Sequence, residues 1–360
     1  MTAHGGRQRS HGSAVVLALC RPGAVTARLP RARFGLAVLI HEDRTHRPGR
    51  HDGRRMSRHT ILITGGSGLL ALNWALTFRD KHRVVLGLHS RRIALRGADA
   101  CSLDLGSVES VIASIDLLQP DIVIHTAGLT SVERCQSDPT LARHVNVTLA
   151  GNVAQACEKR GVALIHISTD HLFAGEKSQH DELEHASPLN VYAQTKAEAE
   201  RCVAAACPAA LIIRTNFYGW GTRYRDSFSD TVLQALRSGR PISLFTDVFY
   251  TPIIASVVAT TCHELIDAGR SGVFNVAGDQ RLSKFEFGRA VARAFRLDES
   301  LIVPGRLSEM RGLVRRPRDM SLSTKLVTGA LGHGLGCVSE HLNMLRHEED
   351  IGLASELSTL

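Results

Sequence analysis

A tyrosine and a lysine four residues apart, Tyr192 and Lys196, are the side chains of this sequence best suited to acid–base chemistry. They fall in residues 191–196, whose pattern predicts the first turns of a helix, so both project from one helical face. An ammonium beside a phenol favours the phenolate and lowers the phenol's pKa from its usual value of about 10. The pair therefore predicts a phenol that exchanges protons near neutral pH, although this spacing also occurs by chance on ordinary helices.

Hydroxyl groups follow the predicted buried strand at residues 162–167. Ser168, Thr169 and Asp170 come directly after this strand, at the carboxyl end where open α/β sheets bind ligands. Asp170 has two interpretations, a general acid or base and a turn residue that caps the loop. The segment therefore predicts hydroxyl donors near the phenol.

A glycine-rich turn at residues 60–71 runs from an apolar strand into a helical pattern, the context that a dinucleotide-binding fingerprint requires. Gly65 and Gly68 allow a tight turn and a close approach of the backbone to a pyrophosphate, and Ala71 takes the third small position. Backbone amides at the start of the helix can meet the negative charge. The predicted cofactor contacts here are Gly65, Ser67, Gly68, Leu69 and Leu70.

The end of the next strand, residues 83–88, bears on the choice of cofactor. NAD enzymes of this architecture place an acid there for the ribose 2′-hydroxyl, whereas NADP enzymes place cations for the 2′-phosphate. Residues 87–92 read Gly-Leu-His-Ser-Arg-Arg and contain no acid. We therefore predict NADPH, with NADH as the alternative cofactor, and place Ser90 and Arg91 at the phosphate with Arg92 as a further candidate. Simple surface arginines are the competing interpretation.

Several motifs together carry a resemblance to a known family. They are the glycine turn at 64–71, His-Thr-Ala-Gly at 125–128, Ser-Thr-Asp-His-Leu-Phe at 168–173, the tyrosine–lysine segment at 188–196, Arg-Thr-Asn-Phe-Tyr-Gly at 214–219 and Arg-Pro-Arg-Asp-Met-Ser-Leu at 316–322. The chain resembles the extended short-chain dehydrogenases/reductases over residues 58–325. Within that group it is most similar to the dTDP-4-dehydrorhamnose reductase family.

The resemblance implies a doubly wound parallel α/β sheet of Rossmann type with a smaller C-terminal α/β substrate domain. We expect an NAD(P)-binding domain at 58–215, a substrate domain at 216–345 to which 171–189 contribute, and a C-terminal tail at 346–360.

The resemblance also assigns site residues. It makes Thr169, with Ser168 as the alternate, the hydroxyl that acts with Tyr192 and Lys196. The further cofactor contacts that it implies are Asp104, Leu105, Thr126, Ala127 and Gly128, together with Tyr192 and Lys196 themselves. The substrate contacts that it implies are His171, Phe173, Asn190, Asn216 and Arg316. The sequence departs from the family pattern at His171, Ala193 and Phe217, where the family commonly has Tyr, Gly and Trp, and this leaves the sugar open.

The implied activity is NADPH-dependent reduction of a nucleotide-linked 4-keto-6-deoxysugar, as in dTDP-rhamnose or surface polysaccharide biosynthesis. One alternative is an epimerase or dehydratase of the same fold that retains NAD, and another is a non-catalytic nucleotide-binding regulatory subunit. The intact Thr169, Tyr192 and Lys196 argue against a pure binding role. A homodimer is a further expectation.

The basic charge is confined to the start of the chain. The formal charge is +8, yet residues 1–57 hold eleven Arg and three acids, while the remaining residues hold 32 basic and 32 acidic side chains. A neutral remainder argues against a nucleic-acid partner. We interpret 1–57 as a disordered or non-native prefix before a start at Met56, with a targeting peptide or a polyanion-binding arm as alternatives.

The eight cysteines form no Cys-x-x-Cys pair and no zinc pattern with histidine, so we predict no metal site. Thiols without such pairing fit a reducing compartment, and we expect a cytoplasmic protein. The apolar runs in residues 1–57 are too short to cross a bilayer, so we predict no membrane partner.

Overall fold

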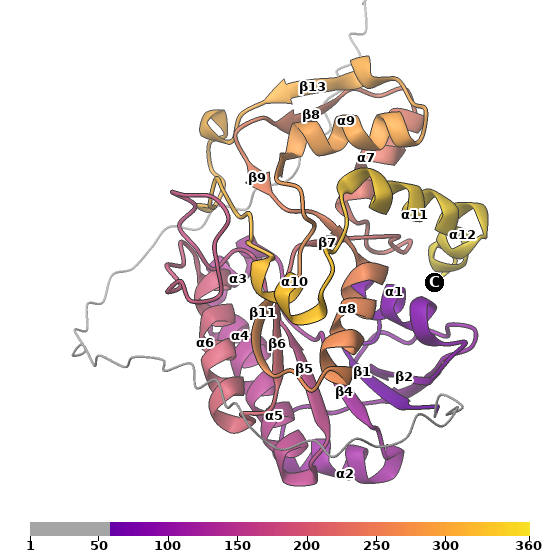
Figure 1. The fold of residues 1–360 in the computed structure, drawn as a ribbon, viewed down its shortest axis with the longest axis vertical. Coiled ribbons are helices and arrows are strands. Elements are labelled where there is room, and N and C mark those ends of the chain that lie inside the picture. The colour runs from indigo at the N-terminus through magenta and orange to yellow at the C-terminus, as the bar shows by residue number, and fades with distance from the viewer. Residues whose placement is uncertain (1–57) are drawn as a thin grey trace, which may run out of the picture. The chain divides into compact units, whose positions relative to one another are not determined.

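Seven parallel strands form the central sheet of the computed structural model, which describes residues 58–360 (Figure 1). The strands are β1 (Thr60–Thr64), β2 (Arg83–Leu88), β3 (Asp99–Ser102), β4 (Ile122–His125), β5 (Ala163–Ile167), β6 (Leu211–Arg214) and β11 (Gly272–Asn275). Their order is β11-β6-β5-β4-β1-β2-β3, so the direction of winding reverses between β1 and β4. Such a reversal opens a ligand crevice at the strands' carboxyl ends. The predicted doubly wound fold is confirmed; the predictions for 1–57 lie outside the described residues.

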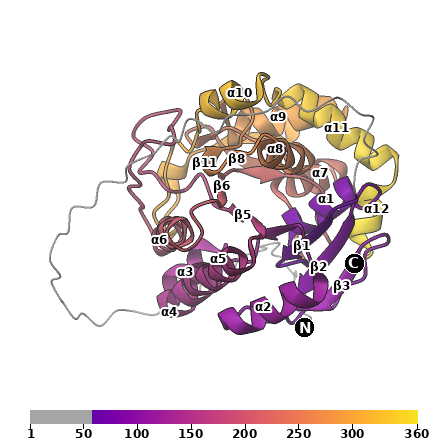
Figure 2. The same ribbon diagram turned by 60° about the horizontal axis from the view of Figure 1, so that its bottom comes forward.

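Helices cover both faces of this sheet because side chains alternate along each strand (Figure 2). Ile61 and Ile63 face α1 (Leu69–Phe78) and α8 (Ala255–Asp267). Leu62 of the same strand packs in the opposite core. The helices of that opposite face are α2 (Val108–Leu118), α5 (Leu149–Arg160) and α6 (Val191–Ala206).

The helical segment at residues 139–160 is not one continuous α-helix. It consists of α4 (Pro139–Arg143), one π-helical turn at His144–Thr148 and α5. Pro139 is tolerated at the first turn of α4, where its missing N–H would have no helical partner. A π turn inside a helix is common at functional sites, and this one contains Asn146.

The second half of the chain adds three two-stranded sheets. They pair β7 (Phe217–Tyr218) with β10 (Ile253–Ile254), β9 (Phe249–Tyr250) with β12 (Leu282–Ser283), and β8 (Ile242–Phe245) with β13 (Ile302–Gly305). The remaining α-helices are α3 (Val132–Ser137), α7 (Phe228–Arg237), α9 (Lys284–Ala294), α10 (Lys325–Leu331), α11 (Val338–Asp350) and α12 (Leu353–Ser358). Short 3₁₀ turns cover Glu299–Leu301 and Leu307–Glu309.

Two segments of the structure bear on the expected domain division. β11 and α8 follow residue 215, yet they belong to the layers of the main sheet. Residues 346–360 are helical, and Leu357 of α12 is fully buried. The Arg79 guanidinium of α1 also donates two hydrogen bonds to the Glu356 carboxylate of α12. The segment is therefore a packed part of the fold, and the division at 215 stays a prediction.

Within residues 58–360, no helix combines the length and apolarity needed to cross a bilayer. The seven cysteines of this described part are free thiols. No group of three or more His, Cys, Asp or Glu side chains there is arranged to hold a metal ion.

Candidate active site

Tyr192 lies in the first turn of α6, next to the hydroxyl of Thr169. The Asn190 side chain caps the helix by accepting a hydrogen bond from the Ala193 N–H (2.9 Å). The Tyr192 ring is only 8 % exposed and meets the His171 ring edge-on, with 5.7 Å between centroids. Burial raises the pKa of Tyr192 to about 12, although the Thr169 hydroxyl opposes this effect. The phenol is therefore protonated at neutral pH.

Lys196 lies one turn along the same helix and points to the end of β5. Its Nζ donates a hydrogen bond to the Ile167 carbonyl oxygen (2.6 Å). Burial lowers the pKa of Lys196 to about 8, and the Glu200 carboxylate partly offsets the shift. The prediction that this ammonium lowers the pKa of the phenol is wrong for this structure, because burial dominates at Tyr192 and the ammonium bonds the backbone instead.

Two buried histidines lie near the lysine and were not predicted as site residues. His125 and His166 are paired in register on β4 and β5, and their rings stack at 5.4 Å with 18° between planes. Burial, with a smaller effect of the Lys196 ammonium, lowers the pKa of His125 to about 3 and that of His166 well below its ordinary value. Both rings are therefore neutral. The only signal in the sequence was His166 near the end of the predicted strand at residues 162–167.

The π turn positions the loop after β4 through Asn146. Its side-chain oxygen accepts from the Leu129 N–H (2.7 Å), and its amide donates to the Leu129 carbonyl (3.2 Å) and the Thr195 hydroxyl (3.0 Å). The residue is buried, and all three contacts are internal. Asn146 thus ties the β4 loop to the helix that carries Tyr192.

The glycine-rich turn approaches the loop after β4 closely and leads into a helix start without a side-chain cap. Gly65 has φ +66°, and a Cβ there would lie 2.8 Å from the Ala127 backbone. Gly68 is the N-cap of α1, and no side chain caps the helix. The first amides of α1 are therefore left for an anion. The side chains of Leu69 and Leu70 are buried, so these residues can offer only backbone groups to a cofactor.

The other predicted cofactor residues lie at neighbouring strand ends. The Thr126 hydroxyl donates to the Thr64 carbonyl (2.7 Å), and Gly128 lies against Asn146, where an added Cβ would approach its oxygen to 3.3 Å. Asp104 accepts from the Gly106 N–H (2.9 Å) in the turn after β3, while Leu105 packs in the core. Ser90 and Arg91 are exposed after β2. No acid stands at the end of β2 to accept from a ribose 2′-hydroxyl, and the residues present fit a dinucleotide that carries a 2′-phosphate.

A polar cluster surrounds Asp170, near the Tyr192 phenol. The Asn216 amide donates to the buried Asp170 carboxylate (2.5 Å), and burial lowers the pKa of His171. Lys284, the first residue of α9, adds an ammonium 3.3 Å from the centroid of the Tyr250 ring. Burial lowers the pKa of Lys284 to about 8 and Asp170 opposes this. Lys284 was not predicted as a site residue, and its proximity to Asp170 follows only from the structure.

Three predicted substrate residues have other roles in the structure. Phe173 is 0 % exposed and stacks on His180 at 4.2 Å, so it is a core residue. Asn190 uses its oxygen to cap α6 and its amide to bond the Arg315 carbonyl (2.9 Å), so it positions the helix and the loop at 315. Arg316 forms an ion pair with Glu133 of α3. The motif resemblance identified these positions but could not reveal that internal partners occupy them.

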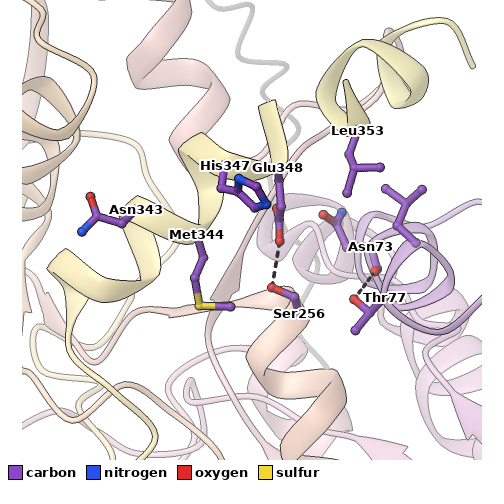
Figure 3. A pocket seen from close by; sticks show the side chains of 9 residues that line it. Asn73, Thr77, Ser256, Asn343, Met344, His347, Glu348 and Leu353 are labelled. Carbon is purple, nitrogen blue, oxygen red and sulfur yellow. Dashed lines mark hydrogen bonds between the residues drawn. The ribbon is translucent and has the colours of Figure 1, made fainter. Parts of the chain in front are cut away.

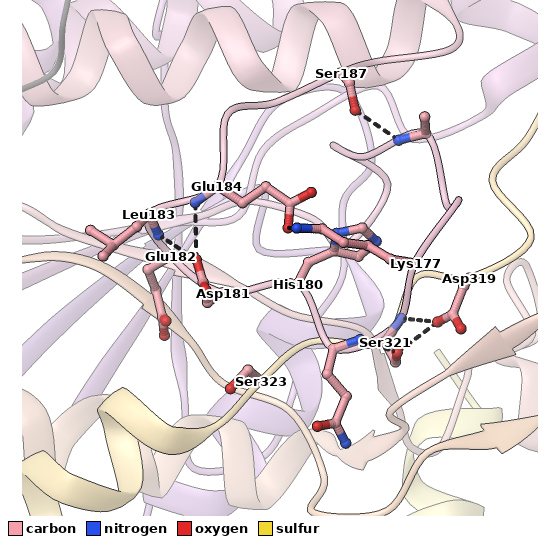
Figure 4. A network of polar contacts seen from close by, with 12 residues as sticks. Lys177, His180, Asp181, Glu182, Leu183, Glu184, Ser187, Asp319, Ser321 and Ser323 are labelled. Atoms are coloured by element: carbon pink, nitrogen blue, oxygen red, sulfur yellow. Dashed lines mark hydrogen bonds and ion pairs between the residues drawn. The ribbon is translucent and has the colours of Figure 1, made fainter.

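A hydrogen-bond network fastens the 171–189 segment to the loop that contains Arg316 (Figure 4). The Gln179 N–H donates to the Ser321 hydroxyl (2.8 Å), which itself donates to Asp319 (2.6 Å). His180 contacts Glu184 through Nδ1 (2.9 Å), and its carbonyl accepts from Asn275 (2.9 Å). These contacts support the proposal that 171–189 contribute to the substrate half.

A separate cavity of about 440 Å³ lies between α1, α8, α11 and α12 (Figure 3). Its lining includes Thr77, Met344 and Leu353. Ser256 donates to the Glu348 carboxylate there (2.9 Å), and burial raises the pKa of Glu348. None of the predicted catalytic, cofactor or substrate residues lines this cavity.

Comparison with known proteins identifies the family. The model of the RmlD substrate binding domain matches residues 59–345. The chain belongs to this family. The expected resemblance to the dTDP-4-dehydrorhamnose reductases of the extended short-chain dehydrogenase/reductase group is thereby confirmed.

Two proteins that are similar to this chain have names that describe different functions. The probable low-salt glycan biosynthesis reductase Agl14 of Haloferax volcanii is 33 % identical over 276 residues, which are 75 % of this chain and 92 % of that protein. The methionine adenosyltransferase 2 subunit beta of Bos taurus is 28 % identical over 280 residues, 76 % of this chain and 83 % of that protein. Membership of the RmlD-like family therefore does not by itself decide between a reductase and a subunit of another enzyme.

A solved structure supports the fold. The dTDP-4-dehydrorhamnose reductase of Bacillus anthracis, solved in complex with NADP, matches with a TM-score of 0.71 at 22 % identity. The match covers 81 % of this chain and 99 % of that one.

Proposed function

We propose that this RmlD-like protein is a cytoplasmic NADPH-dependent reductase that acts on the keto group of a nucleotide-linked 4-keto-6-deoxysugar and serves glycan biosynthesis. The observation that carries the proposal is the Tyr192 phenol beside Thr169, buried at the carboxyl end of β5. Reduction of a ketone needs a proton donor at the developing alkoxide, and a phenol with a pKa of about 12 is in the donor form at neutral pH.

Groups of this chain would bind the cofactor, orient the substrate and transfer the proton. When bound, NADPH would supply the hydride. The turn at Gly65 and Gly68 and the start of α1 would hold its pyrophosphate, with Arg91 at the 2′-phosphate. Thr169 would donate a hydrogen bond to the keto oxygen, and Tyr192 would deliver the proton to the same atom. Lys196 can restore a proton to the phenol and bond a ribose hydroxyl, because its pKa of about 8 lets it give up a proton near neutral pH.

The polar cluster around Asp170 supports a sugar substrate. Asp170, Asn216 and Lys284 combine an anionic acceptor, an amide and a cation near the phenol, a set that suits sugar hydroxyls. An exposed Arg91 with no nearby acid after β2 supports NADPH over the NAD that an epimerase or dehydratase would retain.

A regulatory subunit is the second candidate function, favoured by the similarity to the methionine adenosyltransferase subunit. The two candidates differ in what they require of the phenol. A binding subunit needs the nucleotide site but no proton donor, whereas a reductase loses turnover when the donor is removed.

The experiment is anaerobic incubation of the purified chain with NADPH and a panel of dTDP-, GDP- and UDP-linked ketosugars, followed by mass analysis of the products. We expect one substrate to gain two hydrogens. Tyr192→Phe keeps the ring and should reduce turnover by about 10²- to 10⁴-fold while NADPH affinity holds. Full activity of Tyr192→Phe, or NADPH binding without turnover of any sugar, would favour the subunit.

A further inference from the structure

A short hairpin carries side chains from the second half of the chain to the nucleotide-binding half. Thr222 and Arg225 exchange two backbone hydrogen bonds of 2.9 and 3.0 Å, which closes residues 222–225 into a turn that we call the tip loop. Next to it the Gly221 N–H donates to the Asp230 carboxylate at the start of α7 (2.8 Å). The tip loop is therefore held in shape by its own hydrogen bonds and by α7.

The tip loop contacts both sides of the predicted cofactor crevice. The Tyr224 hydroxyl donates to the Ser67 carbonyl in the turn after β1 (2.9 Å). The Arg225 guanidinium donates to the Thr130 hydroxyl in the loop after β4 (2.8 Å). Strand order reverses between β1 and β4, so the tip loop lies across the place where a dinucleotide binds in doubly wound sheets.

Tyr224 also contacts the arginine predicted to select the cofactor. The guanidinium carbon of Arg91 lies 3.7 Å from the centroid of the Tyr224 ring, well inside the distance of about 6 Å at which cations and aromatic rings attract each other. Stacking uses the flat face of the guanidinium and leaves the N–H groups in its plane available to phosphate oxygens. An exposed arginine without such a support would spread over many rotamers.

We propose that Tyr224 is a positioning residue for cofactor selection. Its ring holds the Arg91 guanidinium with its donors directed to the 2′-phosphate of NADPH, and its hydroxyl fixes the ring to the glycine-rich turn through Ser67. This inference rests on the proposed use of NADPH. It adds that selection depends on a residue 133 positions away from Arg91, on the other half of the chain.

The test compares the dissociation constants of NADPH and NADH, measured by fluorescence titration of the purified full-length variants. Tyr224→Leu removes the ring and should weaken NADPH binding by about 2- to 30-fold, the usual range for a cation–π contact. NADH has no 2′-phosphate and should change by less than about 2-fold. Tyr224→Phe keeps the ring and should retain most of the selectivity. Arg223→Ala removes an exposed arginine of the same turn and serves as the matched control.

A double mutant separates positioning from general stabilisation. Arg91→Ala should reduce NADPH affinity by about 10- to 100-fold, and adding Tyr224→Leu should cost little more, because the ring acts through the guanidinium. Arg91→Lys keeps the charge but loses the flat stack, and it changes an exposed side chain whose loss does not threaten folding. The ratio of NADPH to NADH affinity of Arg91→Lys should be close to that of Tyr224→Leu.

Three results would overturn the role of Tyr224. The first is an equal loss of NADPH and NADH affinity in Tyr224→Leu. The second is that the losses of NADPH affinity in the two single variants add fully in the double mutant. The third is an unchanged ratio of NADPH to NADH affinity in Tyr224→Leu when Arg91→Ala lowers this ratio. If Arg91→Ala itself leaves the ratio of NADPH to NADH affinity unchanged, the phosphate assignment fails and the role of Tyr224 fails with it. The sugar reduction assay does not depend on this ratio, so failure of the proposed activity remains distinguishable.

Discussion

Acidification from pH 7.5 to 5.5 should destabilise this protein through its buried histidines. His125, His166 and His263 are each less than 9 % exposed, and burial holds the pKa of His125 at about 3 and that of His263 at about 4. In the unfolded chain each should titrate near 6.5. Above pH 6.5 both states are neutral and nothing is lost. Below it the unfolded chain binds protons that the fold excludes, so the free energy of unfolding falls as the pH drops toward 4.

The size of the effect follows from the gap between the two pKa values. One pH unit below 6.5, a histidine that stays neutral in the fold costs about 1.4 kcal/mol. The three histidines together should therefore remove about 4 kcal/mol at pH 5.5, a large part of the roughly 5 to 15 kcal/mol that keeps a typical protein folded.

His166→Phe isolates one of the three contributions. Within the described part of the chain neither nitrogen of His166 has a hydrogen-bond partner, so a phenyl ring should fit without breaking a contact. Urea unfolding at several pH values between 5 and 7.5 should show that, from pH 7.5 to 5.5, the free energy of unfolding of this variant falls by about 1.4 kcal/mol less than that of the parent. The carboxylates contribute equally in both chains, so their contribution cancels when the slopes of unfolding free energy against pH are compared. His185→Gln changes an exposed histidine and should leave the slope unchanged. An unaltered slope in His166→Phe would refute the reasoning.

Three other predictions test the ion pairs, the mechanism and the prefix. Arg214→Met leaves the buried Glu200 carboxylate without its bidentate partner and should cost about 3 to 5 kcal/mol in urea unfolding, whereas Arg214→Met with Glu200→Leu should recover most of the loss. Lys196→Ala should slow NADPH oxidation and also weaken cofactor binding. In a double-mutant cycle with Tyr192→Phe, the losses in rate should not add. Additive losses would contradict a shared role of the two residues. A chain that begins at Met56 should keep the thermal midpoint and turnover of the full chain. A large drop in either would show that residues 1–55 contribute to stability or activity.

The parts of the fold that could be predicted from sequence are those set by local patterns. The strand at Thr60–Thr64 and the glycine turn before a helix have the spacing typical of a nucleotide-binding βα unit, and the structure contains this strand and helix. The π turn at His144–Thr148 was missed, because one extra residue per turn hardly disturbs helical periodicity.

The parts that could not be predicted depend on contacts between distant segments. Whether Phe173 meets substrate or packs on His180 is decided by a loop that folds back on it. The pKa of Tyr192 is decided by how much protein covers the ring, and the position of Lys284 near Asp170 by how α9 is placed. None of these features leaves a periodicity or a motif in the sequence.

The place of β11 in the sheet has a consequence for synthesis of the chain. β6 is flanked by β5 and β11, so after residue 215 leaves the ribosome the apolar strand Leu211–Arg214 remains an open edge until Gly272–Asn275 has been made. Open apolar edges invite pairing with other chains. The sheet face that α8 covers is also bare during this interval. A nascent chain of this protein should therefore need protection from aggregation for the time it takes to translate about 60 further residues, on the order of 3 to 12 seconds at ordinary elongation rates.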